Sequence, residues 1–153
     1  VVIDGETTVL TVRGERDHSW GPRPWDMGWQ FLVVNNERFS MLATQVVIPG
    51  WPLISMGYYH SHGEAMEHLS ETELTLSFNE ADPTQAVSGS FSLLCESGRK
   101  INGTLEAISG TEIDITHTFA IPHRTEYRRS LIRCKFDDGS ESIGWFECNR
   151  ELG

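Results

Sequence analysis

The dominant pattern along the chain is an alternation of apolar and polar side chains with a period of two. Over Thr72–Phe78, the side chains of Leu74, Leu76 and Phe78 share one face, and polar side chains share the other. This pattern is typical of an antiparallel strand with one face in the core and the other in water. The same alternation recurs over Ser90–Cys95, Ile101–Ala107 and Glu112–Phe119.

Less regular strands complete the prediction, at Thr7–Arg13, Gly28–Asn35, Arg38–Ile48, Leu53–His60, Arg128–Phe136 and Ser142–Cys148. Turn-forming pairs separate many of the strands, namely Asn35-Asn36, Pro49-Gly50, Ser97-Gly98, Ser109-Gly110 and Asp138-Gly139. Helical turns are expected only near Glu64–Leu69 and at the C-terminus. The sequence therefore predicts an all-β fold, and about ten short strands at close spacing indicate a barrel or a sandwich.

Two stretches depart from the alternation because they are apolar on both faces. Val33-Val34 and Val46-Val47-Ile48 place apolar side chains on each side of a predicted strand. Such strands are buried twice, so we expect a second sheet, a partner domain or a dimer contact to cover the outer face.

The length and the net charge of the chain narrow the classes of protein to which it can belong. The chain has 153 residues, which suits one domain over residues 1–153. Its net charge of −10 argues against nucleic-acid binding and against docking on anionic membranes. No apolar run reaches the ~18 residues of a membrane span. The chain starts at Val1 without a basic leader, so we expect a signal peptide to be absent or already removed.

The number and spacing of the cysteines indicate whether the protein belongs to a reducing or an oxidising compartment. Cys95, Cys134 and Cys148 are odd in number and widely spaced, which does not fit a disulfide framework or a Cys-x-x-Cys zinc site. We expect small buried apolar side chains in a reducing compartment, and hence a cytoplasmic protein.

One polar and aromatic segment near the start breaks the alternation. Gly14–Trp25 brings together Arg16, Asp17, His18 and Trp20. If the segment is extended, Arg16, His18 and Trp20 point one way and Asp17 the other. A histidine moves protons near neutral pH, and a neighbouring carboxylate raises its pKa and orients it. The alternative is a purely structural role, in which an Arg–Asp ion pair is capped by an indole.

The same segment carries a resemblance to a known family. Arg16-Asp17-His18-Ser19-Trp20-Gly21 resembles the Asp-His-x-Trp-Gly signature of the lipocalin-like AttH and carotenoid 1,2-hydratase (hydroxyneurosporene synthase) superfamily. The chain is most similar to an uncharacterised branch that often pairs two such domains. Further similarity to the second domain of that branch lies in Gly57-Tyr58-Tyr59, Gly63-Glu64, and Gly144-Trp145-Phe146-Glu147 with Arg150.

The resemblance implies a calycin-like barrel with an apolar pocket. Relatives include hydratases and cyclases that act on isoprenoid or polyketide substrates. Asp17 and His18 match the acid–base candidates of the signature, and Trp20 and Gly21 match its aromatic residue and its turn. A second lipocalin-like domain is the partner that the resemblance implies, and a homodimer is the alternative.

Other candidate residues come from their positions in the predicted strands. His117 lies between Ile115 and Phe119 at an inward position, where it is either a core histidine or, if the barrel has a lumen, a second proton-transfer group. Aromatic side chains could either pack the core or wall a pocket and stabilise a developing carbocation. These are Trp29, Phe31, Tyr59, Trp145 and Phe146.

A histidine-rich stretch raises the question of a metal. His60-x-His62 with Glu67 has a metal-ligand spacing, but the rest of a cupin pattern is missing and Gly63 suggests a turn. We therefore expect a hairpin tip in water, and no metal or cofactor.

These observations lead to three hypotheses. The first is a cofactor-independent hydratase, dehydratase, isomerase or cyclase, in which Asp17, His18 or His117 transfers a proton to or from a hydrophobic small molecule. Its binding residues would be Arg16, Trp20, Trp29, Phe31, Tyr59 and Trp145. The second is a non-catalytic carrier of such a ligand, and the third is an interaction subunit that uses the apolar region Val33–Ile48.

Overall fold

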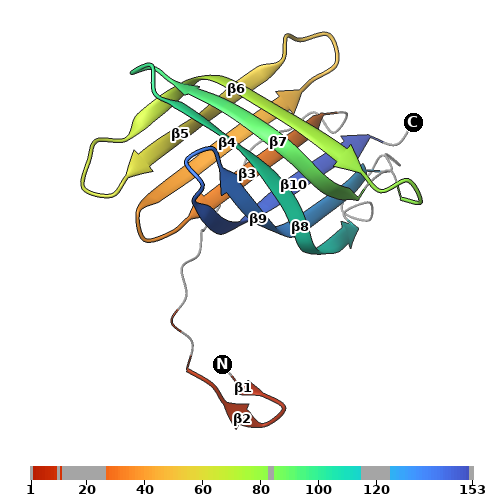
Figure 1. Ribbon diagram of the computed structural model, residues 1–153. Helices are drawn as coiled ribbons and strands as arrows, with labels where there is room; N and C mark the ends of the chain where they lie inside the picture. Colours follow the sequence, from red (N-terminus) through yellow and green to blue (C-terminus); the bar gives the residue numbers. More distant parts are fainter. Residues whose placement is uncertain (1, 10, 12–26, 83–84, 115–124, 152–153) are drawn as a thin grey trace.

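Eight antiparallel strands close into a barrel (Figure 1). The computed structural model describes residues 2–9, 11, 27–82, 85–114 and 125–151. The barrel strands are β3 (Gly28–Asn35), β4 (Phe39–Val47), β5 (Ile54–Ser61), β6 (Glu67–Phe78), β7 (Ala86–Cys95), β8 (Lys100–Asp114), β9 (Thr125–Phe136) and β10 (Glu141–Glu151).

The strands follow one another around the barrel in chain order. Each pairs with the next, and β10 returns to pair with β3 through Gly144–Val34 and Phe146–Leu32. This up-and-down arrangement gives every barrel strand two neighbours, which lowers the usual risk of edge-to-edge aggregation. The predicted all-β antiparallel barrel is thus confirmed.

The predicted number of barrel strands was too high. Eight strands form the barrel, while β1 (Val2–Ile3) and β2 (Glu6–Thr7) form a separate two-stranded sheet. Asp4 and Gly5 join these two short strands, with φ of 51° and 84°. Two consecutive positive φ angles are typical of a tight hairpin turn. Of the expected strand Thr7–Arg13, Thr7 belongs to β2, Thr8, Val9 and Thr11 are not in a strand, and the other residues lie outside the described part of the chain.

Two predicted strands turned out to be one. Strand β8 runs through Ser109-Gly110, where a turn was expected, and joins Ile101–Ala107 to the start of Glu112–Phe119. A register shift between Ala107 and Ser109 marks a β-bulge there. Turn-forming residues inside a long strand are tolerated at a bulge, because the extra residue bends the strand without ending it.

Helix is absent from the described part of the chain, so the helical turn expected at Glu64–Leu69 was wrong. A short turn leads instead into β6, which begins at Glu67. In the described residues, nothing helical is long and apolar enough to cross a membrane.

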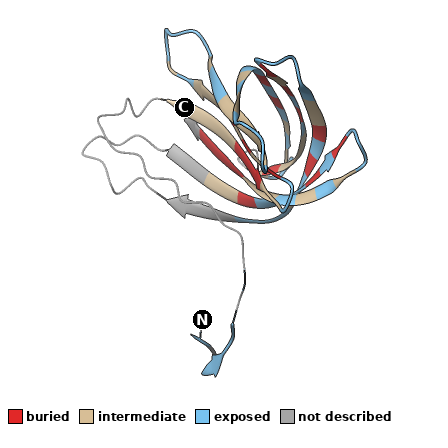
Figure 2. Ribbon diagram, turned by 90° about the vertical axis from the view of Figure 1, so that its left-hand side faces the viewer, coloured by how far each residue is buried: buried red, intermediate tan, exposed pale blue. Residues whose placement is uncertain are grey.

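The core fills the middle of the barrel. Figure 2 shows buried positions concentrated in the barrel strands and exposed positions in the hairpin turns. Phe146, Leu32, Met41, Leu93 and Ile132 are among the largest fully buried side chains. The rings of Phe39 and Phe91 each meet the Phe136 ring edge-on, at centroid distances of 5.4 and 5.5 Å. The interior is therefore packed with side chains rather than hollow from end to end.

The three cysteines belong to this interior, as expected. Cys95, Cys134 and Cys148 are buried and form no disulfide. Burial raises the pKa of the Cys134 thiol to about 12 and also raises that of Cys95, so both stay protonated at neutral pH.

The predictions for the two doubly apolar stretches had different outcomes. Val33 and Val34 are both buried although they lie on opposite faces of β3, as predicted. Val47 is exposed, so the second stretch is not covered on both faces. That exposed position is the last residue of β4, where it pairs with Gly28 at the start of β3.

One seam of the barrel is paired over a short length. Between β5 and β6 the register consists of Tyr58–His68 and Tyr59–Glu67. By contrast, β4 and β5 pair continuously from Phe39–Ser61 to Val46–Ile54. The first half of β5 and most of β6 therefore diverge from each other toward one end of the barrel.

Candidate functional site

The two ends of the barrel differ in how they are closed. At one end, which we call the hairpin end, β4 starts at Phe39 and tight turns join β7 to β8 and β9 to β10. At the other end, which we call the mouth, β3 starts at Gly28, β4 ends at Val47 and β6 ends at Phe78. Each end holds a cavity.

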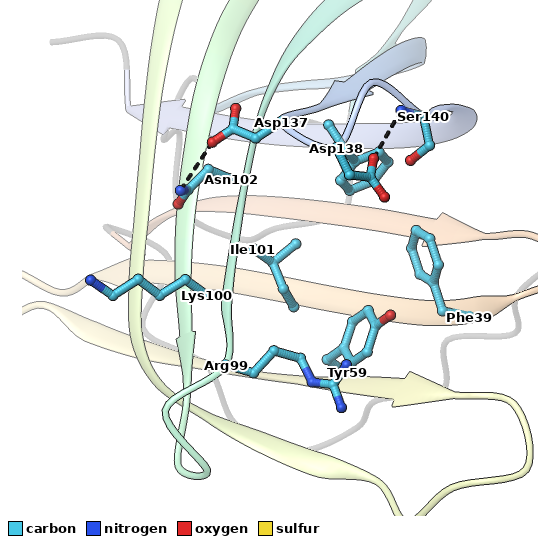
Figure 3. A pocket seen from close by; sticks show the side chains of 10 residues that line it. Phe39, Tyr59, Arg99, Lys100, Ile101, Asn102, Asp137, Asp138 and Ser140 are labelled. Atoms are coloured by element: carbon cyan, nitrogen blue, oxygen red, sulfur yellow. Dashed lines mark hydrogen bonds between the residues drawn. The ribbon is translucent and has the colours of Figure 1, made fainter.

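The hairpin end encloses the smaller cavity, of about 190 Å³. Figure 3 shows the side chains that line it, with Tyr59 and Phe39 on the strands that face Ile101. The Arg99 Nε donates to a carboxylate oxygen of Glu67 over 2.7 Å, and its guanidinium carbon lies 5.2 Å from the centre of the Tyr59 ring. Arg99 also pairs with Glu64 at 3.3 Å.

Polar groups on the other side of this cavity are likewise paired with each other. The Asn102 amide donates to Asp137 over 3.2 Å, and the Ser140 backbone N–H donates to Asp138 over 2.8 Å (Figure 3). The hydrogen bonds from Ser140 lower the pKa of Asp138 below its usual value. Burial raises the pKa of Tyr59, which keeps its hydroxyl neutral. Arg99, Asp137 and Asp138 therefore already have partners within the protein.

The mouth holds a larger cavity, of about 370 Å³. This volume lies within the usual range of small-molecule sites, ~300–1,000 Å³. None of the described residues around it carries a formal charge, and many are apolar. They are Gly28, Trp29, Gln30, Gln45, Val47, Pro49, Leu53, Phe78, Cys148 and Asn149.

Two glutamines place polar groups at inward positions of the mouth. Gln30 and Gln45 face each other across the β3–β4 register, one step beyond Leu32 and Ala43 of the core. The Gln45 amide donates to the Thr72 carbonyl of β6 over 2.9 Å, which spans the diverging seam. In contrast, the Gln30 Oε1 is buried and accepts no hydrogen bond from the described residues.

A buried acceptor without a donor is costly, by ~1–3 kcal/mol. The Gln30 oxygen therefore gives the mouth a fixed polar position in mostly apolar surroundings. A ligand that brings an O–H or N–H to this oxygen would recover that free energy, and this is the usual way in which a few polar groups orient a ligand in an apolar pocket.

The segment that carries the expected chemistry lies outside the described residues. This holds for Arg16, Asp17, His18 and Trp20, and also for His117. Its attachment to the barrel is described, however. The Asn149 side-chain amide donates to the Met27 carbonyl over 3.0 Å, and Met27 directly precedes β3. The segment thus joins the barrel at the mouth.

The aromatic candidates do not gather in one place. Trp29 borders the mouth cavity, whereas Tyr59 lies at the hairpin end and Phe146 belongs to the core. Phe31 and Trp145 alternate with core residues of β3 and β10, which places them on the outer face of the barrel. There the Arg129 guanidinium lies over the Trp145 ring, 5.3 Å from its centre, and also pairs with Glu147.

The histidine-rich stretch does not form a metal centre. His62 contacts the Ser40 hydroxyl at 3.3 Å and the Glu37 carbonyl at 3.0 Å, while Glu67 binds Arg99. The rings of His60 and His62 are 5.8 Å apart. Within the described ranges, His, Cys, Asp and Glu side chains do not form a group of three or more that could hold a metal ion.

Among the polar residues and cysteines of the mouth, sequence reasoning missed Gln30, Gln45, Cys148 and Asn149. A signal for the glutamines exists, because each is a polar residue at an inward position of an otherwise apolar strand. Cys148 gave no such signal, since a buried cysteine is ordinary in a core.

The comparison with known families identifies the chain. It matches the family described as "Domain of unknown function (DUF7064)" over residues 1–152, and therefore belongs to that family. No curated protein and no solved structure matches the chain.

Proposed function

We propose that this member of the DUF7064 family binds a mostly apolar small molecule in the mouth of its barrel, with a hydroxyl or N–H of the ligand donating to Gln30. The observation that carries the proposal is the buried Gln30 oxygen, which lacks a donor among the described residues and borders a cavity of about 370 Å³. The apolar lining selects for apolar ligands. The Gln30 oxygen and the Asn149 Oδ1, which is likewise buried without a donor among the described residues, select for donors at fixed positions.

The first function for this site is catalysis by proton transfer. Asp17 and His18 would act as general acid and base on an alkene or alcohol carbon of an isoprenoid-like or polyketide-like ligand, as a hydratase, dehydratase, isomerase or cyclase. Two considerations support this. The segment resembles the lipocalin-like hydratase superfamily at these residues, and it enters the barrel at Met27, beside the mouth. His117 is a further candidate, since it belongs to the connection between β8 and β9.

The second function is that of a carrier without catalysis. It is favoured by the composition of the mouth, because none of the described residues that line it is Asp, Glu, His, Lys or Arg. Proton transfer therefore depends on residues outside the described lining. If those residues form a structural ion pair instead, the mouth stores or presents its ligand unchanged.

Replacing Gln30 by methionine tests the binding site directly. We expect the wild-type protein to bind 2-naphthol roughly ten-fold more tightly than naphthalene, because the hydroxyl supplies the missing donor. The Gln30→Met variant should lose this preference and keep its affinity for naphthalene. Its free energy of unfolding should stay equal or rise slightly, because a buried acceptor without a donor is removed. Fluorescence titration and urea unfolding measure the two quantities.

Gln85→Met is the matched control, since the Gln85 side chain accepts from Asn79 in the β6–β7 connection and does not line the mouth. It should keep the preference for 2-naphthol. If both ligands bind the wild type equally, or if neither binds, the proposed site is wrong.

Asp17→Asn and His18→Ala separate the catalyst from the carrier. With farnesol as the probe in D₂O, mass spectrometry follows the loss or gain of water and the incorporation of deuterium. For the catalyst, we expect each variant to bind 2-naphthol normally and to lose ~10²–10⁴-fold in rate.

If the protein is a carrier, farnesol stays unchanged in the presence of the wild type and of both variants. A third outcome points to the structural role of the segment. If Asp17→Asn lowers the free energy of unfolding by ~3–5 kcal/mol, the carboxylate belongs to a buried ion pair.

A further inference from the structure

The β4–β5 hairpin is free of charge over its whole length. From Phe39 to Gly63 the sequence contains no Asp, Glu, Lys or Arg, and this is the longest such run in a chain with 22 acidic and 12 basic residues. Both strands and both faces of the hairpin are included. A surface hairpin normally carries charged residues on its outer face, so this absence needs a physical reason.

The turn of this hairpin lies at the mouth, not at the hairpin end, and it exposes large apolar side chains to solvent. Trp51 donates its backbone N–H to the Ile48 carbonyl over 3.0 Å, and Gly50 has a φ of 79°. With Pro49 at the preceding position, this is the pattern of a tight type II turn. The exposed fractions are 69% for Trp51, 56% for Val47, 55% for Leu53 and 50% for Met56. We call these four residues the apolar tip.

The apolar tip is continuous with the mouth cavity. Val47 and Leu53 both line that cavity and are both more than half exposed. Phe78, on the opposite side of the diverging β5–β6 seam, also lines it. An apolar path therefore leads from the outer surface of the hairpin into the cavity.

We infer that the apolar tip docks the mouth onto an uncharged lipid surface, so that an apolar ligand passes between lipid and cavity without crossing water. Inserting the hairpin into a lipid interface buries no charge, which removes the largest cost of such insertion. A tryptophan at the leading turn is the side chain that favours the interface between lipid and water. The purpose of docking, though not the docking itself, rests on the proposed function.

Size and charge favour lipid over a protein partner. The four residues of the apolar tip lie within the short segment Val47–Met56, whereas a stable protein interface uses about 20–30 residues on each side. The net charge of −10 repels anionic lipids, so the surface that fits is zwitterionic or neutral.

Flotation with phosphatidylcholine vesicles tests the inference. We expect the wild-type protein to float with the vesicles, and Trp51→Ser and Leu53→Ser each to lower the ratio of bound to free protein by about ten-fold. Ile143→Ser is the matched control, because Ile143 is 49% exposed on the outer face of β10, away from the tip. It should float like the wild type. Binding should persist in ~0.5 M salt and should weaken when phosphatidylserine is added.

Each outcome decides between the alternatives. If the wild type binds 2-naphthol but does not float, the lipid surface is wrong and the cavity remains. If it floats but binds neither naphthalene nor 2-naphthol, the proposed function fails and the docking stands. If the free protein sediments as a dimer that Trp51→Ser converts to a monomer, the tip contacts a second copy and the inference is overturned.

Discussion

Phe146→Ala is expected to lower the free energy of unfolding by about 3–5 kcal/mol. Phe146 is almost fully buried on the inner face of β10, opposite Leu32 of β3. The substitution removes most of a buried aromatic side chain and leaves a cavity that the closed wall cannot collapse to fill, because every barrel strand is held by two neighbours. Urea unfolding followed by tryptophan fluorescence measures the change.

Leu131→Ala is the control for this prediction. Leu131 lies on the neighbouring strand β9 and is about half exposed on the outer face. Its truncation should cost less than ~1 kcal/mol, because little buried area is lost. Comparable losses for both variants would contradict the description of the inner face as the core.

Gly144→Ala is expected to destabilise the barrel by about 3 kcal/mol, although it adds only one methyl group. A Cβ at position 144 would overlap the carbonyl oxygen of Val33 and would lie 3.0 Å from the Val34 Cγ2. Since the first obstacle is backbone, relief requires β10 and β3 to move apart at the register pair that closes the barrel. Circular dichroism during thermal unfolding should show a drop in Tm of roughly 10 °C.

Gly110→Ala provides the contrast within the same fold. A Cβ at Gly110 would meet the Ser130 Oγ at 3.0 Å, and a side-chain hydroxyl can rotate away. We expect a change within ~1 kcal/mol of zero, since replacing glycine in a strand also lowers the entropy of the unfolded chain. Equal destabilisation by both substitutions would show that the close approach at Gly144 is not the cause.

Much of the fold could be predicted where the alternation is regular. Leu74, Leu76 and Phe78 gave the correct face of β6, and Phe91 with Leu93 did the same for β7, because period two is a direct consequence of strand geometry. The strand order was not predicted, although it agrees with the short turns, since short connections join antiparallel neighbours.

Errors arose where local chemistry and tertiary pairing disagree. Ser109-Gly110 has the composition of a turn, but continuous pairing of β8 with β9 on both sides of it holds the chain extended, and the conflict is resolved by a bulge. Similarly, Glu67–Leu69 is compatible with a helical turn in isolation, yet Glu67 and His68 pair with β5. Local propensity is weak against such pairing.

The candidate site was predictable in kind but not in place. The family resemblance implied an apolar pocket in a β-barrel, and the aromatic residues named for it turned out to lie in separate parts of the molecule. Trp145 shows the reason, because its position was inferred from residue type and not from the register that puts it on the outer face. The register of a closed sheet depends on all eight strands together, and no single segment encodes it.

The short pairing between β5 and β6 has a consequence for motion. Beyond the Tyr58–His68 pair, the backbone amides of β6 that point toward β5 have no ladder to protect them from hydrogen exchange. The amides of β6 that point toward β7 lie in the β6–β7 ladder and are protected. Deuterium uptake along β6 should therefore alternate between fast and slow from residue to residue. If the barrel opens first along the β5–β6 seam, the mouth widens sideways. The aromatic core and the Arg99 network then keep the hairpin end closed.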